Sequence, residues 1–221
     1  MKRVCICGTS KTLKKTPRDI TGLEYWILND MYLITNKYDR LFQIHAREFL
    51  EKSADSTGTP SITALSNITV PIYMQDSHDD ISNSVKYPKD EVIKYFGREL
   101  FQSSVDYMVA LAIYEGYEEI YLYGVDMQVN EEYSYQKPSC SYWLGVAEGK
   151  GIKVYMPPEC DLLKSYYSYG YDDIKRNALA IKAEESIKEL EVQQKTFSKN
   201  HYIAMGAKDT WEYILRSISE V

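Results

Sequence analysis

The sequence predicts an α/β protein with a mostly parallel, Rossmann-like sheet, helices on both faces of that sheet, and a C-terminal helical hairpin. Three observations support this fold class. Short apolar runs alternate with helical segments through most of the chain, and a polar residue stands where each run ends. With 221 residues and 44% hydrophobic content, the chain has enough apolar material for one complete core and an appendage.

Six short apolar runs have the length and composition of strands that are buried inside a sheet. The first run leads into a polar loop that begins at Gly8, and the fifth leads directly into Gly124. We expect the strands at residues 4–7, 24–28, 40–44, 70–74, 120–123 and 152–156.

Helices are expected between these strands. The clearest begins at a pair of serines and continues through an apolar stretch over residues 103–115. Pro88 can occupy the first turn of another helix, because the N–H that proline lacks would have no partner there. Further helices are expected at 46–52, 88–96 and 142–148, whereas the polar stretch 75–84 is predicted to form a mobile loop or lid.

The composition changes near residue 171, where Lys and Glu become frequent. We therefore predict a Rossmann-like nucleotide-binding domain at residues 1–168 and a helical hairpin at residues 169–221. Apolar residues keep helical spacing on both sides of a predicted break at Met205-Gly206-Ala207. Two helices with narrow apolar stripes must bury them against the main domain or against another copy of the chain, and we expect a homo-oligomer.

Charge and cysteine content narrow the possible partners. The chain has 26 Lys and Arg against 32 Asp and Glu, a net charge of -6. Neither nucleic acid nor a membrane is expected as a partner, because both need a dense basic face. The four cysteines lack metal-ligand spacing and are predicted to be reduced, and the apolar run that follows the basic first residues is too short for a signal peptide. A cytoplasmic protein with a small-molecule ligand is expected.

Residues 102–127 are the most informative segment for function. A helix that opens at Ser103 and Ser104 is followed by a strand that ends at Gly124 and Asp126. Helix N-termini present free N–H groups, and ligands of open α/β sheets bind beyond the carboxyl ends of the strands. This segment therefore predicts a phosphate or nucleotide site.

Other polar residues are expected at the same edge of the sheet. Gly8, Thr9 and Ser10 follow the first strand and suit either a tight turn or contacts to a phosphate or ribose. Asn29 follows the second strand, where it would contact a ribose or base, or bond its own backbone. His45 follows the third strand and is either a general acid or base or a structural residue.

Two carboxylates are candidates for the chemistry. Asp126 would bind ribose hydroxyls or a divalent ion such as Mg²⁺, and no dedicated metal site is expected. Glu159 would be a second carboxylate at the sheet edge, or would complement the N-terminus of a following helix. Tyr133, Tyr135 and Gln136 are predicted to lie on the loop after the fifth strand, where they could stack on a base or bond a sugar.

The order of these parts resembles a known family. The motifs G-T-S-K-T-L, S-S-V-D-Y-M, E-I-Y-L-Y-G-V-D-M, S-Y-W-L-G and I-K-V-Y-M-P-P-E-C look like those of the bacterial lipooligosaccharide sialyltransferases. They are also similar to the wider Rossmann-like group that includes archaeal hydroxymethylpterin diphosphokinases and many bacteriophage proteins. The resemblance spans residues 1–165. It implies a nucleotide-sugar donor that is contacted by Gly8, Thr9, Ser10, Asn29, Ser103, Ser104, Gly124 and Asp126.

One departure from this family concerns catalysis. The sialyltransferases have their catalytic histidine directly after a hydrophobic-Gly pair, and in this chain Leu144-Gly145 is followed by Val146. A valine cannot accept a proton from an acceptor hydroxyl.

Two functions therefore remain open. One is a nucleotide-dependent transferase that moves a glycosyl or diphosphoryl group, with Asp126, Glu159 or His45 as the catalytic group. The other is a non-catalytic phage protein that binds and sequesters a nucleotide-derived signal.

Overall fold

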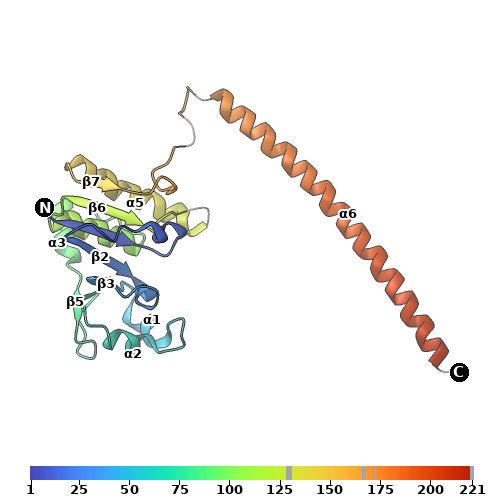
Figure 1. Ribbon diagram of the computed structural model, residues 1–221, viewed down its shortest axis with the longest axis horizontal. Coiled ribbons are helices and arrows are strands. Elements are labelled where there is room, and N and C mark those ends of the chain that lie inside the picture. Colours follow the sequence, from blue (N-terminus) through green and yellow to red (C-terminus); the bar gives the residue numbers. More distant parts are fainter. Residues whose placement is uncertain (128–130, 166–167, 172, 220–221) are drawn as a thin grey trace. The chain divides into compact units, whose positions relative to one another are not determined.

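The computed structural model describes residues 1–127, 131–165, 168–171 and 173–219. The chain divides into two compact units, Met1–Lys164 and Ser165–Val221, and each is described by itself. The first unit is built on a seven-stranded sheet in which every pair of neighbouring strands is parallel. This confirms the predicted α/β fold class (Figure 1).

The strands lie in the order β5-β4-β3-β2-β1-β6-β7. From β1 the chain adds strands on one side as far as β5 and then returns to place β6 on the other side of β1. The direction of winding therefore reverses between β1 and β6, and ligands of open α/β sheets bind at such a switch point. The strands are β1 (Arg3–Cys7), β2 (Leu23–Leu28), β3 (Arg40–Phe42), β4 (Ile72–Met74), β5 (Ser84–Lys86), β6 (Glu119–Tyr123) and β7 (Lys153–Tyr155).

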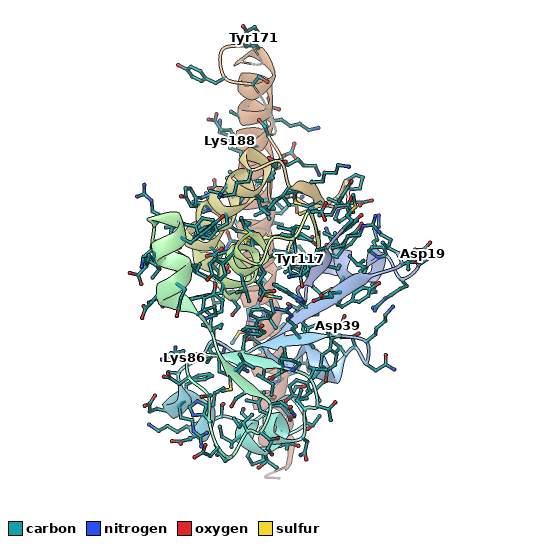
Figure 2. All side chains as sticks on the ribbon, turned by 90° about the vertical axis from the view of Figure 1, so that its left-hand side faces the viewer. Asp19, Asp39, Lys86, Tyr117, Tyr171 and Lys188 are labelled. Atoms are coloured by element: carbon teal, nitrogen blue, oxygen red, sulfur yellow. The ribbon has the colours of Figure 1, made fainter. Side chains whose placement is uncertain are left out.

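Strand β5 was missed in the sequence because it is short and polar. It lies at one edge of the sheet, where Lys86 is labelled in Figure 2. A charged side chain on an edge strand hinders pairing with another chain, so its sequence lacks the apolar run of an internal strand. The stretch 75–84, predicted to be a loop or lid, forms turns in which the fully buried Ile81 contributes to the core and the last residue begins β5.

Helices cover both faces of the sheet, and the alternation of side chains in β1 shows the two cores. Val4 and Ile6 pack on one side with residues of α3 (Lys89–Phe96), α4 (Ser104–Tyr114) and α5 (Glu131–Gly149). Cys5 and Cys7 point to the other side, with their sulfur atoms 3.7 Å apart. That second core includes residues of the 3-10 helices η1 (Lys11–Lys15) and η2 (Asn29–Leu33) and of α1 (Arg47–Lys52) and α2 (Ser61–Ser66).

Helix α4 is the most deeply buried helix of this unit, with Met108, Val109, Ala110 and Ala112 fully shielded from solvent. Its first turn is closed by a capping box. The Ser103 hydroxyl accepts a hydrogen bond from the Asp106 backbone N–H, and the Asp106 carboxylate accepts one from the Ser103 N–H at 2.9 Å. Because such a box fixes where a helix begins, the position of the α4 N-terminus is set by the sequence itself.

Helix α5 corrects one prediction. It was expected at residues 142–148, but it begins at Glu131, and residues 133–136 are therefore helical instead of forming a loop. The polar start of this segment and Pro138 within it are signals of a loop in the sequence. Burial of Cys140, Trp143 and Leu144 against α4 stabilises the helix despite these signals.

The second unit also corrects a prediction. The expected hairpin is one continuous helix, α6 (Asp173–Ser219), with no break at Met205-Gly206-Ala207 (Figure 1). A single glycine inside a helix costs only about 1 kcal/mol, and no proline follows Gly206 to end the helix. Within the described residues, no helix is both long enough and apolar enough to cross a membrane.

Candidate functional site

A cavity of about 400 Å³ lies at the switch point of the sheet. Its wall combines residues that follow β1, β2, β3 and β6 with the first residues of α4. This volume lies in the range of small-molecule sites. The lining residues are Gly8, Thr9, Ser10, Leu28, Asn29, His45, Gln102, Ser103, Ser104, Val105, Gly124, Val125, Asp126, Met127 and Gln136.

Two glycines allow the loops after β1 and β6 to touch. A Cβ atom added to Gly8 would lie 2.3 Å from the Gly124 carbonyl oxygen, and one added to Gly124 would lie 2.1 Å from the Gly8 carbonyl oxygen. Gly124 also has a φ of +73°, a conformation that glycine adopts without strain. The Gly8 N–H donates to Tyr123 and the Ser10 N–H donates to Gly124, at 2.8 and 2.9 Å. The floor of the cavity is therefore a direct backbone contact.

Thr12 and Asp126 lock this contact in place. The Thr12 hydroxyl accepts a hydrogen bond of 2.8 Å from the Gly124 N–H and donates a short one to the Asp126 carboxylate. The other oxygen of that carboxylate accepts from the Thr12 N–H at 3.3 Å. Asp126 is only 2% exposed, so its two oxygens are both used within the protein. In this arrangement Asp126 positions the two loops; a catalytic role for it stays a prediction.

The N-terminus of α4 opens onto the same cavity. Ser103, Ser104 and Val105 line it, and in the described part of the chain the backbone N–H groups of Ser104 and Val105 have no acceptor. Free N–H groups at a helix N-terminus, together with the helix dipole, attract anions. This side of the cavity therefore provides hydrogen-bond donors.

Asn29 lines the same cavity from the end of β2. Its backbone has a φ of +49°, which is uncommon for a residue other than glycine. Its Oδ1 atom is buried and has no hydrogen-bond partner in the protein. A buried unpaired acceptor costs free energy and strained backbone is concentrated at functional sites, so both features favour a ligand contact.

His45 is held in one orientation by Gln43, which was not among the site residues predicted from the sequence. Its Nδ1 atom lies 2.6 Å from Oε1 of the buried Gln43. An amide oxygen can only accept, so Nδ1 carries the proton and the neutral ring has an unprotonated Nε2. Nε2 has no hydrogen-bond partner among the described residues. This is the geometry of an oriented proton acceptor.

The other predicted site residues lie elsewhere or are not described. Glu159 does not line the cavity; it forms an ion pair with Lys15, and the hydrogen bond from that lysine, assisted by its positive charge, lowers the pKa of the Glu159 carboxyl. The Tyr135 side chain is 71% exposed and does not line the cavity, whereas Gln136 does. The side chain of Tyr133 is outside the described residues. Val146 packs against the core around α4 and is absent from the cavity wall.

No metal site is apparent in the parts of the chain that the structure describes, where no three His, Cys, Asp or Glu side chains gather around one point. Mg²⁺ prefers free carboxylate oxygens. Both oxygens of Asp126 are bonded to Thr12, and Glu159 is paired with Lys15. The two predicted carboxylates thus do not form a ready pair of ligands for Mg²⁺.

Solved structures with a similar arrangement of the chain are sialyltransferases. The sialyltransferase CstII from Campylobacter jejuni, in complex with cytidine-5'-monophosphate, is 21% identical over 72% of this chain and 80% of that chain, with a TM-score of 0.43. The same enzyme with CMP-3FNeuAc is 21% identical over 72% and 81%, with a TM-score of 0.44. A structure of CST-II with a trisaccharide acceptor and CMP is 19% identical over 72% and 81%, with a TM-score of 0.43.

No family model matches the chain, and no curated protein matches it.

Proposed function

We propose that the α/β unit binds a nucleotide or a nucleotide-sugar in the cavity at the switch point. The observation that carries this proposal is the pairing of free donors and free acceptors across one cavity. The free N–H groups of Ser104 and Val105 lie at the N-terminus of α4, and Asn29, whose buried Oδ1 has no partner, lines the cavity from the end of β2. A phosphate accepts hydrogen bonds and a ribose donates them, so one nucleotide satisfies both sides.

The chemistry that fits best is group transfer with His45 as the base. In that reaction Nε2 of His45 takes the proton of a hydroxyl group on the acceptor. The oxygen of that hydroxyl group then bonds to the sugar carbon or the phosphorus atom of the donor. The nucleotide leaves with the electrons of the broken bond. Gln43 keeps Nδ1 protonated, so Nε2 is the only ring nitrogen that can accept. His45 would thus serve as the base in place of Val146, which stands where the sialyltransferases have their catalytic histidine and cannot accept a proton.

The proposal is tested by removing the Asn29 side chain without changing its backbone. Asn29→Gly keeps the positive φ at no steric cost, so the free energy of unfolding should change by no more than about 1 kcal/mol. Loss of a buried acceptor should weaken nucleotide binding by about tenfold, measured by calorimetry with the nucleoside mono- and diphosphates of the common bases, with and without Mg²⁺.

The matched control is Asn36→Gly, the same change at an exposed position in the loop before β3. It should leave nucleotide affinity unchanged. If no nucleotide in the panel binds the unaltered protein, the proposed function is wrong. If Asn29→Gly and the control bind equally well, nucleotides bind elsewhere.

A second function, binding without turnover, is favoured by one observation. Asp126 is bonded to Thr12, and Val146 packs in the core, so neither position offers a free catalytic group. In this case the protein sequesters a nucleotide-derived signal, as a phage protein would do. Native mass spectrometry of the purified protein should then find one stoichiometric ligand, recovered unchanged after denaturation. A chemically altered ligand, or turnover that is lost in His45→Ala, favours the transferase.

We also propose that α6 mediates a homo-oligomer. Every seventh residue from Leu190 is apolar, giving Leu190, Phe197, Ala204, Trp211 and Ile218, the spacing of one coiled-coil core position. Leu190, Phe197 and Trp211 are 61, 76 and 67% exposed, and the described residues of the unit Ser165–Val221 include no second helix to cover them. Light scattering of the unaltered protein should give a multiple of 25.6 kDa, the mass of one chain. The variant Phe197→Glu should be a monomer of 25.6 kDa. Equal masses for both proteins would contradict this.

A further inference from the structure

A second cavity adjoins the first. It has a volume of about 470 Å³ and lies between the ends of β2 and β3 and the helices α1 and α2. Thr9, Leu28, Asn29 and His45 line both cavities, so the two share a wall. The two cavities are therefore neighbours at Asn29 and His45.

The polar groups on this side are hydrogen-bond acceptors without partners. Asp30 lines the second cavity, and in the described part of the chain its carboxylate has neither a hydrogen bond nor an ion pair. Burial and the nearby Asp55 carboxylate raise the pKa of Asp30, and His45 partly offsets this. Together with Asn29 Oδ1 and His45 Nε2, Asp30 gives three free acceptors near the shared wall. Hydroxyl groups are the donors that such a wall would match.

The same cavity has an apolar surface beside these acceptors. The ring of Phe49 is 56% exposed and stacks on His45, with 5.0 Å between ring centroids. Met31 and Ile34 line the cavity with it. A pyranose has an apolar face of C–H groups and a rim of hydroxyls, so a flat aromatic surface next to acceptors suits it.

Charge discriminates between kinds of sugar. None of the described residues that line either cavity is Lys or Arg, and the second cavity contains the Asp30 carboxylate. A carboxylate on the ligand would meet a like charge there, and no lysine or arginine side chain lines the cavities to compensate for it. An acidic sugar is therefore disfavoured at this position.

We propose that the second cavity binds the sugar of a nucleotide-sugar, and that this sugar is neutral and rich in hydroxyls. The proposal rests on the nucleotide site proposed above and adds the class of the group that is attached to the nucleotide. Asp30 and Asn29 accept hydroxyl hydrogens, and Phe49 contacts the apolar face of the ring. His45 lies on the shared wall, where the bond between sugar and nucleotide would pass.

Calorimetry with matched ligands tests the sugar site. The probes are ADP, CDP, GDP, UDP and dTDP, each compared with its glucose conjugate, together with UDP-glucuronate, which differs from UDP-glucose by one carboxylate. For the base that binds, the glucose conjugate should bind about tenfold tighter than the bare diphosphate. UDP-glucuronate should bind more weakly than UDP-glucose.

Two variants test whether the residues of the second cavity cause these differences in affinity. Phe49→Ala should remove most of the gain from glucose and leave affinity for the bare diphosphate unchanged. Asp30→Asn should reduce the preference for UDP-glucose over UDP-glucuronate. The matched control Asp19→Asn, at the exposed loop position labelled in Figure 2, should change neither quantity.

The outcomes separate this inference from the proposed function. If bare diphosphates bind but their glucose conjugates bind no tighter, the sugar site is wrong and the nucleotide site remains. If UDP-glucuronate binds as well as UDP-glucose, or if Asp30→Asn and Asp19→Asn behave alike, the argument from charge is wrong. If bare diphosphates and conjugates do not bind but a nucleoside monophosphate does, the sugar site is wrong; if none of these ligands binds, the nucleotide site itself is wrong.

Discussion

The two sides of the cavity wall differ in how their polar groups are used. On the side of β1 and β6, Thr12 and Asp126 satisfy each other, and Thr12 also satisfies the Gly124 N–H. On the side of β2 and β3, Asn29 and Asp30 have acceptor oxygens with no partner in the described part of the chain. On both sides these polar residues follow the ends of parallel strands.

This difference distinguishes residues that stabilise the structure of the site from residues that are available to bind a ligand. A buried polar group that is fully bonded stabilises the fold, whereas one left unpaired lowers stability and is retained where a ligand can satisfy it. Changes on the β1 and β6 side should therefore reduce the free energy of unfolding. Changes on the β2 and β3 side should leave it almost unchanged and affect binding.

The largest effect is expected at Gly124. Gly124→Ala would place a Cβ 2.1 Å from the Gly8 carbonyl oxygen and impose a side chain on a backbone with a φ of +73°. We expect a loss of roughly 3 to 5 kcal/mol, the sum of backbone strain and overpacking. Urea unfolding followed by the fluorescence of the buried Trp26 and Trp143 measures it.

Gly22→Ala is the matched control for this prediction. Gly22 has the same φ of +73°, but a Cβ there would meet nothing within 4 Å. This variant should lose only about 1 to 2 kcal/mol, the cost of the backbone conformation alone. Equal losses in the two variants would mean that the loops after β1 and β6 separate easily and that their contact does not define the site.

An intermediate effect is expected for Asp126. Asp126→Asn replaces an acceptor of two hydrogen bonds from Thr12 and should cost about 1 to 3 kcal/mol of the free energy of unfolding. Thr12→Val should cost a similar amount, because it leaves the Gly124 N–H and the Oδ1 atom of the carboxylate unpaired. The double variant should lose clearly less than the sum, since both changes remove one network. Additive losses would show that Asp126 acts independently of Thr12.

Much of the fold was predictable, because six strands and the start of α4 have strong local signals. The apolar runs of β1, β2 and β6 can only be buried, and the Ser103 capping box states where α4 begins. Strand β5 was not predictable by these rules, because an edge strand needs no apolar run. The continuous helix α6 was missed because Gly206 was interpreted as a helix break. The free-energy cost of one glycine inside a helix is too small to support that interpretation.

For the site, the sequence identified which strand ends converge but not how their side chains are used. Gly8, Asn29, His45, Ser103 and Gly124 line one cavity because parallel strands end at the same edge. Thr12 and Gln43 were missed, because their importance comes from partners that are distant in sequence or set by side-chain geometry. A signal was available for Gln43, since it precedes His45 by two residues and shares its side of the chain.

The smallest effect is expected for Asp30, as a dependence of stability on pH. Burial, then repulsion by Asp55, raises the pKa of Asp30 in the folded protein, with His45 acting in the opposite direction. A carboxyl whose pKa is raised by folding holds its proton more tightly in the folded state. The protein therefore loses stability as the pH rises through the window between the ordinary and the raised pKa. Asp30→Asn should remove this loss.

The difference between Asp30→Asn and the unaltered protein should accordingly be near zero at about pH 3 and favour the variant at about pH 7. Urea midpoints across this range measure it, with Asp19→Asn as the control that should show no such divergence. If instead Asp30→Asn is the less stable protein at neutral pH, its carboxylate stabilises the fold as Asp126 does. The two sides of the cavity would then not differ in the way that the unpaired acceptors indicate.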